Sequence, residues 1–298
     1  MISVIVPTLN GAVRMPKLVG SLLRQTVKDV EVIVIDSESE DRTAGVAAGL
    51  GCAVYTIARG RFDHGGARNL GVQKASGEIL VFLTQDAIPA SQDFLARLTG
   101  PIDGRLTAAA YARQIPAEGA TPLETFARLY NYPPESSMRH LSRIERRTLR
   151  TFFFSNSASA VSRNCFEKVG GFPAPVSTNE DMLLCARMLD AGYQVAYAAE
   201  AKVIHSHQFS MCELFQRYLR IGAVLTEYRD TLRSDGSSGE GMDFVRRQIS
   251  YLRHAGRYEW VPNAIAEAAV KACGYYCGHA LQRTRSLAQH KTVSQPSQ

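Results

Sequence analysis

The stretch Ile79-Leu80-Val81-Phe82-Leu83-Thr84-Gln85-Asp86-Ala87-Ile88-Pro89 decides how the rest of the chain is interpreted. Its first five residues are all apolar, which is typical of a strand that is buried on both faces of a sheet. The run ends at Thr84-Gln85-Asp86, and Pro89 has no amide hydrogen, so we expect no further pairing there. Asp86 then stands at the rim of the predicted core. It either closes a turn, caps the helix expected near Ser91, or binds a ligand.

Two earlier apolar runs end in the same way. Ser3–Pro7 is followed by the polar loop Thr8-Leu9-Asn10-Gly11, and Glu31–Asp36 runs directly into Ser37. The alternation of strands and helices up to residue 90 predicts a right-handed, doubly wound, mostly parallel sheet. Because parallel strands end at one edge of a sheet, these polar ends are expected to face one crevice, which favours a ligand at Asp86. The other elements of this alternation are helices expected at Met15–Gln25, from Ser37 onward and at Ala67–Ala75, and a strand at Ala53–Ile57.

The segment Arg59-Gly60-Arg61-Phe62-Asp63-His64-Gly65-Gly66-Ala67-Arg68-Asn69 concentrates polar side chains and glycines. Glycine allows the backbone to approach a ligand closely. Arg68 and Asn69 at the start of a helix suit an anion or the edge of a base. A hydrated loop with structural caps is the alternative, and the density of polar groups favours ligand contact.

The predicted crevice differs from common nucleotide-binding sites. No GxGxxG follows the first strand, and no GxxxxGK[ST] occurs anywhere in the chain. A backbone cradle for phosphate is therefore not expected. A metal ion held by a carboxylate is the obvious substitute for neutralising phosphate charge.

Composition narrows the class of protein further. The 298 residues, 45% hydrophobic and 21% charged, are ample for a globular core, and no apolar run approaches the roughly 18 residues that span a bilayer. A strand is expected from Ile2, so no secretory signal is predicted. Six scattered cysteines without a CxxC pair predict a reduced cytosolic protein without disulfides or zinc fingers. The net charge of +6 favours anionic partners, but no nucleic-acid-binding signature is present.

The second half of the chain contains two further groups with metal or acid–base chemistry. Glu180 and Asp181 precede a clear helix at Met182–Leu189; such acids usually cap a helix, but they also suit a general base held at a helix start. After a strand at Gln194–Ala198, the segment that contains His205 and His207 is expected to continue as a strand. Alternate residues of a strand share a face, so the two imidazoles form a possible pair of metal ligands.

Other segments are expected to complete the fold. Strands are predicted at Ala108–Arg113 and Phe152–Val161, the latter with a polar notch at Ser155-Asn156. The segment Arg139–Arg150 carries five arginines against one acid and forms either a solvated face or a surface for anionic lipid. We expect two helices to pack on the core, at Phe209–Gly222 and Trp260–Leu281, with a linker at Ser234–Gly241 between them. Membrane contact or oligomerisation is the alternative.

Taken together, these pieces resemble a family 2 glycosyltransferase with the GT-A fold, and in particular its bacterial rhamnosyltransferase-like members. The resemblance is continuous from residue 2 to about residue 225. It rests on the order and spacing of Val4-Ile5-Val6-Pro7-Thr8-Leu9-Asn10, Val34-Ile35-Asp36-Ser37, Phe62-Asp63-His64-Gly65-Gly66-Ala67-Arg68-Asn69, Phe82-Leu83-Thr84-Gln85-Asp86-Ala87, Phe154-Ser155-Asn156, Asn179-Glu180-Asp181 and His205-Ser206-His207.

The resemblance implies a fold, a reaction and a set of site residues. The fold is α/β, with a Rossmann-like, mostly parallel central sheet flanked by helices and a C-terminal helical extension. The reaction is the inverting transfer of a sugar from a nucleoside diphosphate to a hydroxyl of a surface glycan. Asp181 is the implied general base, with Glu180 beside it, and Ser155 and Asn156 lie on the acceptor side. The implied nucleotide-sugar ligands are Pro7, Thr8, Asn10, Asp36, Ser37, Asp63, Gly66, Arg68, Asn69, Gln85 and Asp86.

The implied cofactor is Mg²⁺ or Mn²⁺, held by Asp86, His205 and His207. The usual Asp-x-Asp motif of the family is reduced here to Thr84-Gln85-Asp86, which leaves one carboxylate at that position. By resemblance, dTDP-rhamnose is the favoured donor and a glycan or lipid-linked glycan is the acceptor. A cytoplasmic location with peripheral contact to the inner membrane fits the positive charge.

Three other functions are each compatible with part of the sequence. The single carboxylate of the metal motif suits a catalytically silent nucleotide-sugar-binding or scaffold protein, whereas Glu180 and Asp181 argue against it. A nucleotidyltransferase would carry a basic, glycine-rich loop after the first strand, where Thr8–Val13 has none. A membrane-interaction module rests on basic segments alone. The expected division is a glycosyltransferase domain at 1–225, a helical extension at 226–285 and a disordered tail at 286–298.

Overall fold

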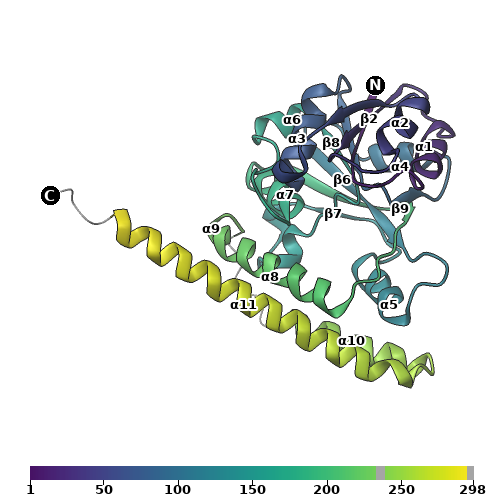
Figure 1. Cartoon of the computed structure of the whole chain (residues 1–298). Helices are drawn as coiled ribbons and strands as arrows, with labels where there is room; N and C mark the ends of the chain where they lie inside the picture. Colours follow the sequence, from purple (N-terminus) through teal and green to yellow (C-terminus); the bar gives the residue numbers. More distant parts are fainter. Residues whose placement is uncertain (233–238, 294–298) are drawn as a thin grey trace.

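The computed structural model describes residues 1–232 and 239–293 of the chain. These residues form a mixed nine-stranded sheet in the order β3-β2-β1-β4-β8-β6-β9-β5, with β7 paired to β9 beside this path (Figure 1). The strands are β1 (Ile2–Thr8), β2 (Val30–Asp36), β3 (Ala53–Thr56), β4 (Ile79–Leu83), β5 (Ile88–Pro89), β6 (Thr107–Ile115), β7 (Ser137–Arg139), β8 (Ala158–Ser162) and β9 (Gln194–Ile204).

Helices flank both faces of this sheet (Figure 1). In the first part of the chain they are α1 (Met15–Leu23), α2 (Thr43–Gly49), α3 (His64–Lys74), α4 (Phe94–Thr99), α5 (Pro122–Asn131), α6 (Arg163–Lys168) and α7 (Glu180–Asp190). The C-terminal part contributes α8 (Met211–Glu227), α9 (Arg229–Leu232), α10 (Glu240–His254) and α11 (Val261–Val293).

The parallel half of the sheet follows the alternation that the sequence predicts. β1 pairs in parallel with β2 on one side and with β4 on the other, and β3 extends the sheet beyond β2. Thr8 lies opposite Asp36 at the end of its strand, and β4 ends beside the same edge. The prediction that three polar strand ends meet at one edge is therefore confirmed.

The other half of the sheet is mixed. β8 runs antiparallel to both β4 and β6, whereas β6 and β9 are parallel. The predicted strand at Phe152–Val161 is wrong for its first residues, because the strand starts only at Ala158 and the preceding residues form a short 3-10 turn and a loop. This loop contains Ser155 and Asn156, which are consequently placed beside the start of α7.

Pro89 does not end the pairing as we expected. Ile88 and Pro89 form the short strand β5, antiparallel to β9, with Pro89 opposite Val203. This position is compatible with proline because β5 is the last strand of the sheet, and an edge strand needs amide donors on one side only.

Two apolar layers fill the space between sheet and helices. One lies beneath α1, α2 and α4 and includes Met15, Leu18 and Phe94. The other lies beneath α3, α6 and α7 and includes Phe82 and Leu184. A sheet covered on both faces leaves only its edges and strand ends for ligands, as in other open α/β folds.

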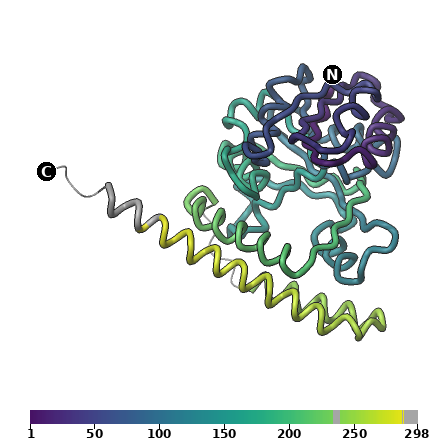
Figure 2. The backbone as a smooth tube through the Cα atoms, in the orientation of Figure 1, coloured from purple at the N-terminus to yellow at the C-terminus, as the bar shows by residue number. Residues whose placement is uncertain are grey.

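The C-terminal helices form a separate layer, and the tube in Figure 2 shows α11 running alongside α8 and beyond the body. The close approach requires glycine: a Cβ at Gly222 of α8 would lie 2.1 Å from the carbonyl oxygen of Tyr275, and one at Gly278 of α11 would lie 1.9 Å from that of Leu219. The expected boundary at residue 225 falls inside α8. The expected linker overlaps residues 233–238, which lie outside the described residues. The helix α11 continues past residue 286, where we expected disorder, and residues 294–298 lie outside the description.

Candidate functional site

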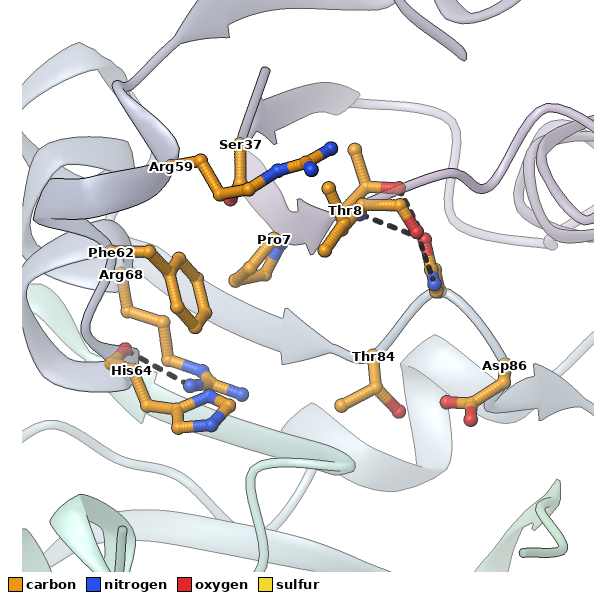
Figure 3. Close-up of a pocket in the computed structure, with 11 residues that line it drawn as sticks. Pro7, Thr8, Ser37, Arg59, Phe62, His64, Arg68, Thr84 and Asp86 are labelled. Carbon is orange, nitrogen blue, oxygen red and sulfur yellow. Dashed lines mark hydrogen bonds between the residues drawn. The ribbon is translucent and has the colours of Figure 1, made fainter. Parts of the chain in front are cut away.

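A pocket of about 360 Å³ opens at the edge where β1, β2 and β4 end. Figure 3 shows residues of four chain segments around it, with Thr84 and Asp86 on one side and Phe62, His64 and Arg68 on the other. The lining residues are Pro7, Thr8, Leu9, Ser37, Arg59, Phe62, His64, Arg68, Thr84, Gln85 and Asp86.

Gln85 joins the loops that follow β1 and β4. Its amide group donates to the carbonyl oxygen of Leu9 at 3.1 Å and accepts from the amide nitrogen of Leu9 at 3.2 Å and from the Thr8 hydroxyl. A Cβ at Gly11 would lie 2.4 Å from the side-chain carbonyl oxygen of Gln85, so a larger residue there would displace the Gln85 amide from its hydrogen bonds. The pair of loops thus forms a fixed wall of the pocket, with Gln85 as a structural member of it.

Asp86 forms a cluster with His205 and His207. The Nε2 atoms of the two histidines lie 3.4 and 3.2 Å from the two carboxylate oxygens of Asp86, and 2.9 Å from each other. β9 ends at Ile204, so the two histidines lie in the loop directly after the strand and not within it as we expected. Asp86 is therefore not a cap for α4, which begins at Phe94.

The cluster presents ligand atoms that suit a divalent metal. One donor atom from each of these three residues lies within 4.8 Å of the other two. Two nitrogen ligands in cis positions around one ion, with bonds of about 2.1 Å, stand about 3 Å apart, close to the 2.9 Å seen between the Nε2 atoms. The donor set of one carboxylate and two imidazoles therefore fits a metal ion.

Gln114 fixes the orientation of the His205 ring. His205 Nδ1 lies 2.8 Å from Oε1 of Gln114, an atom that can only accept a hydrogen bond, so Nδ1 carries the proton and Nε2 keeps its lone pair. Arg128 donates to the same Gln114 oxygen at 2.7 Å and to the His205 carbonyl oxygen at 3.1 Å. Such outer contacts select the tautomer that binds metal.

The pKa shifts in the cluster favour its metal-binding protonation state. Burial acts to raise the pKa of Asp86, but hydrogen bonds and the charges that His205 and His207 carry when protonated at low pH outweigh it and hold this pKa below its ordinary value. Burial and the neighbouring His205 lower the pKa of His207 to about 4. At neutral pH, Asp86 is thus ionised and His207 is neutral, as metal ligands must be.

Glu180 and Asp181 begin α7, directly after Asn179, whose positive φ of 60° is tolerated by asparagine better than by most residues. Glu180 is buried and accepts from Arg68 at 3.0 Å. Burial acts to raise the pKa of Glu180, but Arg68, His64 and the hydrogen bonds to the carboxylate together outweigh it and hold this pKa below its ordinary value. Burial and the adjacent Glu180 raise the pKa of Asp181 to about 7.

The structure gives Ser155 and Asn156 partners inside the protein. Asn156 donates from its side chain to Glu180 at 3.1 Å and from its backbone to Asp181 at 3.2 Å. Ser155 accepts from Gln114 at 2.8 Å. Both side chains are at least nine-tenths buried, so in this structure they support the two carboxylates and the metal cluster, and their place on the acceptor side stays a prediction.

Other predicted ligands also turn toward the protein. Asp63 caps α3 through Gly66, Asn69 holds both backbone groups of Phe172, and the Asp36 carboxylate accepts from Ser39. The Asn10 side chain accepts from the amide of Glu40. None of these predicted residues is among those that line the pocket, which places them as supports of its walls: Asn10, Asp36, Asp63, Gly66 and Asn69.

Five pocket residues were not among the predicted site residues: Leu9, Arg59, Phe62, His64 and Thr84. Arg59, Phe62 and His64 belong to the dense polar segment that leads into α3, and that density is the signal that could have found them. Part of His64 is open to solvent, yet burial of the rest of the ring lowers its pKa, with Arg68 adding to the effect.

Two buried polar atoms on the pocket wall lack a protein partner. The hydroxyl of Ser37 and Nε of Arg68 make no hydrogen bond within the described part of the chain. Unsatisfied buried polar groups are costly, so they suit a pocket whose ligand supplies the missing partners.

Comparisons with known proteins agree with this geometry. The family model described as Glycosyl transferase family 2 matches residues 3–170. The chain is 38% identical over 281 residues to the O-antigen chain rhamnosyltransferase RfbN of Salmonella typhimurium, covering 93% of this chain and 89% of the relative. It is 36% identical over 280 residues to the O-antigen chain rhamnosyltransferase WbaN of Salmonella anatum, covering 93% and 88%.

Solved structures share the fold at lower identity. The mannosyltransferase PcManGT from Pyrobaculum calidifontis, in complex with GDP-Man and Mn²⁺, superposes with a TM-score of 0.59 at 21% identity, covering 96% of this chain and 79% of that one. TarS 1-349 from S. aureus, in complex with UDP, gives 0.56 at 16% identity, covering 95% and 91%. The GT-A fold expected from the sequence is thus confirmed. With a sheet that carries a nucleotide-sized pocket at its strand ends, and with these relatives, the chain belongs to glycosyl transferase family 2 and is a glycosyltransferase.

Proposed function

We propose that the protein transfers a sugar from a nucleoside-diphosphate sugar to a hydroxyl of a bacterial surface glycan, with inversion at the anomeric carbon. The observation that carries this proposal is the position of the cluster Asp86–His205–His207 at the pocket wall, with Arg68 linking the same pocket to Glu180 beside Asp181. One region thus offers both a place for a leaving diphosphate and a nearby base.

Asp181 is proposed as the base. Its carboxylate takes the proton of the acceptor hydroxyl while the hydroxyl oxygen forms a bond to the anomeric carbon and the bond from that carbon to the diphosphate breaks. The electron pair of the broken bond leaves with the nucleoside diphosphate. A base whose pKa lies near 7 combines a useful ionised fraction at neutral pH with a strong affinity for the proton.

Asp86, His205 and His207 are proposed to hold a divalent metal, which when bound neutralises negative charge on the leaving diphosphate. Of Mg²⁺ and Mn²⁺, two imidazole ligands favour Mn²⁺, since Mg²⁺ prefers oxygen ligands. Thr84 stands where the usual motif has its first acid, so the side chains of the cluster supply one carboxylate and two neutral imidazoles.

The donor and acceptor are proposed from the relatives. Two rhamnosyltransferases that build O-antigen chains match 93% of this chain at 36–38% identity, which supports dTDP-rhamnose as donor and a lipid-linked glycan as acceptor. Pro7, Thr8 and Ser37 are proposed to contact the nucleoside, since they line the pocket at the ends of β1 and β2. The remaining predicted ligands contribute indirectly, by holding the pocket walls in place: Asn10, Asp36, Asp63, Gly66 and Asn69.

We also propose a cytoplasmic location with peripheral contact to an anionic membrane through α11. No helix of the described residues is long and apolar enough to cross a bilayer. On α11, Ile265, Tyr276, Leu281 and Leu287 are exposed, and exposed arginines follow at 283 and 285. Apolar side chains next to cations fit an anionic lipid surface. Co-sedimentation with phosphatidylglycerol vesicles but not with phosphatidylcholine vesicles is expected, and a monomer–dimer transition without vesicle binding would instead assign this face to a second copy.

A thermal-shift screen of nucleotide sugars with and without Mn²⁺ identifies the donor, because a ligand of the folded state raises its melting temperature. Release of nucleoside diphosphate from the stabilising donor then tests whether that donor is the one used in transfer. A nucleotide sugar that stabilises the protein but releases no nucleoside diphosphate would contradict its assignment as donor.

A further inference from the structure

The diphosphate of a donor sugar needs more positive charge than the metal cluster alone provides. Two arginines line the pocket, and both already face carboxylates. Arg68 pairs with buried Glu180 at 3.0 Å, and Arg59 pairs with Glu40 at 2.8 Å. Their charges are therefore largely compensated before a donor arrives.

A third arginine, Arg217 of α8, lies on the metal side of the pocket. Its guanidinium carbon is 5.4 Å from the ring centre of Phe209, and that ring stacks on His207 at 5.2 Å. His207 in turn is 3.2 Å from Asp86. Burial lowers the pKa of His64 on the pocket wall, and the positive charge of Arg217 adds to this effect.

Arg217 is exposed, and no carboxylate within the described residues forms an ion pair with it. A stacking contact with an aromatic ring is weak for an exposed cation, whereas a guanidinium binds phosphate oxygens through two parallel hydrogen bonds. A bound diphosphate can therefore draw Arg217 away from Phe209 at little cost.

The helix that carries Arg217 is held firmly. Its first turn is closed by a reciprocal capping pair between Ser210 and Glu213, and its later part packs against α11 through Gly222. The guanidinium of Arg217 is thus carried by a fixed helix of the C-terminal layer and lies near a site that the central sheet forms.

We infer that Arg217 binds the diphosphate of the donor, so that the C-terminal helical layer supplies part of the donor site. This inference rests on the proposed function for the nature of the donor. It assigns to α8 a ligand-binding task in addition to packing. Arg217 is then the cation that balances the charge of the leaving diphosphate on the side of His207.

The test compares Arg217→Ala and Arg217→Lys with Arg220→Ala, an exposed arginine on the same helix that serves as the matched control. Calorimetry in Mn²⁺ measures the dissociation constants of dTDP, inorganic pyrophosphate and thymidine. We expect Arg217→Ala to weaken the binding of dTDP and pyrophosphate about 10- to 100-fold and Arg217→Lys to weaken it less. Arg220→Ala should leave both affinities unchanged. The affinity for thymidine, which has no phosphate, should stay the same in all variants.

Each other outcome has a definite meaning. Wild-type affinity of Arg217→Ala for both phosphate ligands overturns the inference alone. If Arg217→Ala weakens the binding of thymidine as much as the binding of dTDP, the inference is also overturned, because the arginine then acts on the shape of the pocket. Pyrophosphate binding that depends on Arg217 without any binding of dTDP supports the inference and contradicts the proposed donor. Failure of the wild type to bind either phosphate ligand contradicts both.

Discussion

Glu180 and Asp181 are neighbours in the sequence, yet their carboxylates have pKa values shifted in opposite directions. The negative charge of the Glu180 carboxylate is compensated by Arg68 and by the side-chain amide of Asn156, and its pKa is held below the ordinary value. Burial and the charge of Glu180 raise the pKa of Asp181 to about 7. Adjacent acids with different environments commonly have different roles, and we propose that Glu180 is an anchor and Asp181 the base.

The rate of transfer should depend on pH through Asp181. A base works only when ionised, so kcat/KM should rise about tenfold per pH unit well below pH 7 and level off above it. The measurement is the initial rate of nucleoside diphosphate release between pH 5 and pH 9, at saturating metal. A profile that is flat from pH 5 to pH 8 is incompatible with this assignment.

The same pKa predicts how stability depends on pH. Asp181 binds its proton more tightly in the folded protein than in the unfolded chain, so this proton stabilises the fold fully below about pH 4, and the contribution is lost as pH rises to 7. Asp181→Asn should therefore be as stable as the wild type near pH 4 and more stable above pH 7, by on the order of 2–4 kcal/mol. Urea unfolding at pH 4.5, 6 and 8 checks this, and a stability difference that does not grow with pH would count against it.

Metal affinity should depend on Gln114, although this residue is not itself a proposed ligand. Gln114→Leu removes the acceptor that holds the His205 tautomer, and loss of such a partner typically weakens metal binding 10- to 100-fold. Mn²⁺ titration followed by electron paramagnetic resonance gives the dissociation constant directly. His207→Ala is the reference for loss of a ligand, and Gln248→Leu, a buried glutamine outside the cluster, is the matched control. Equal Mn²⁺ affinity of wild type and Gln114→Leu would remove this role.

The buried pair Arg68–Glu180 should be costly to break from either side. Arg68→Met leaves Glu180 buried without its cation, and removal of one partner of such a pair typically costs 3–5 kcal/mol. The double variant Arg68→Met with Glu180→Leu should recover much of the loss because no lone charge remains. Chemical unfolding of the two single variants and the double variant completes the cycle; purely additive losses would show that the two side chains do not interact.

Local patterns in the sequence predict the part of the fold that depends on them. The uninterrupted apolar runs of β1, β2 and β4 identify the parallel half of the sheet and the edge on which the pocket opens. Pairing between distant segments has no such local signal, so the antiparallel insertion of β8 was not predicted. Nor was the pairing of Pro89 with β9, since whether a strand lies at an edge depends on its neighbours.

The candidate site divides in the same way. The acids and histidines were found because their residue types and spacing carry chemistry, and the structure brings Asp86, His205 and His207 together. Whether a polar side chain faces the pocket or the protein depends on tertiary contacts. Asn69 and Asn156 illustrate this, since loops far away in the sequence engage their amides.

The measurement that tests the account most directly is sugar transfer by wild type and Asp181→Asn under identical conditions. Purified protein is mixed with dTDP-rhamnose, Mn²⁺ and a lipid-linked glycan acceptor, and both dTDP and the extended glycan are quantified. The account predicts that wild type forms the two products in equal amounts, that Asp181→Asn is slower by about 10²- to 10⁴-fold, and that both proteins bind dTDP equally well. Transfer by Asp181→Asn at the wild-type rate would contradict the account.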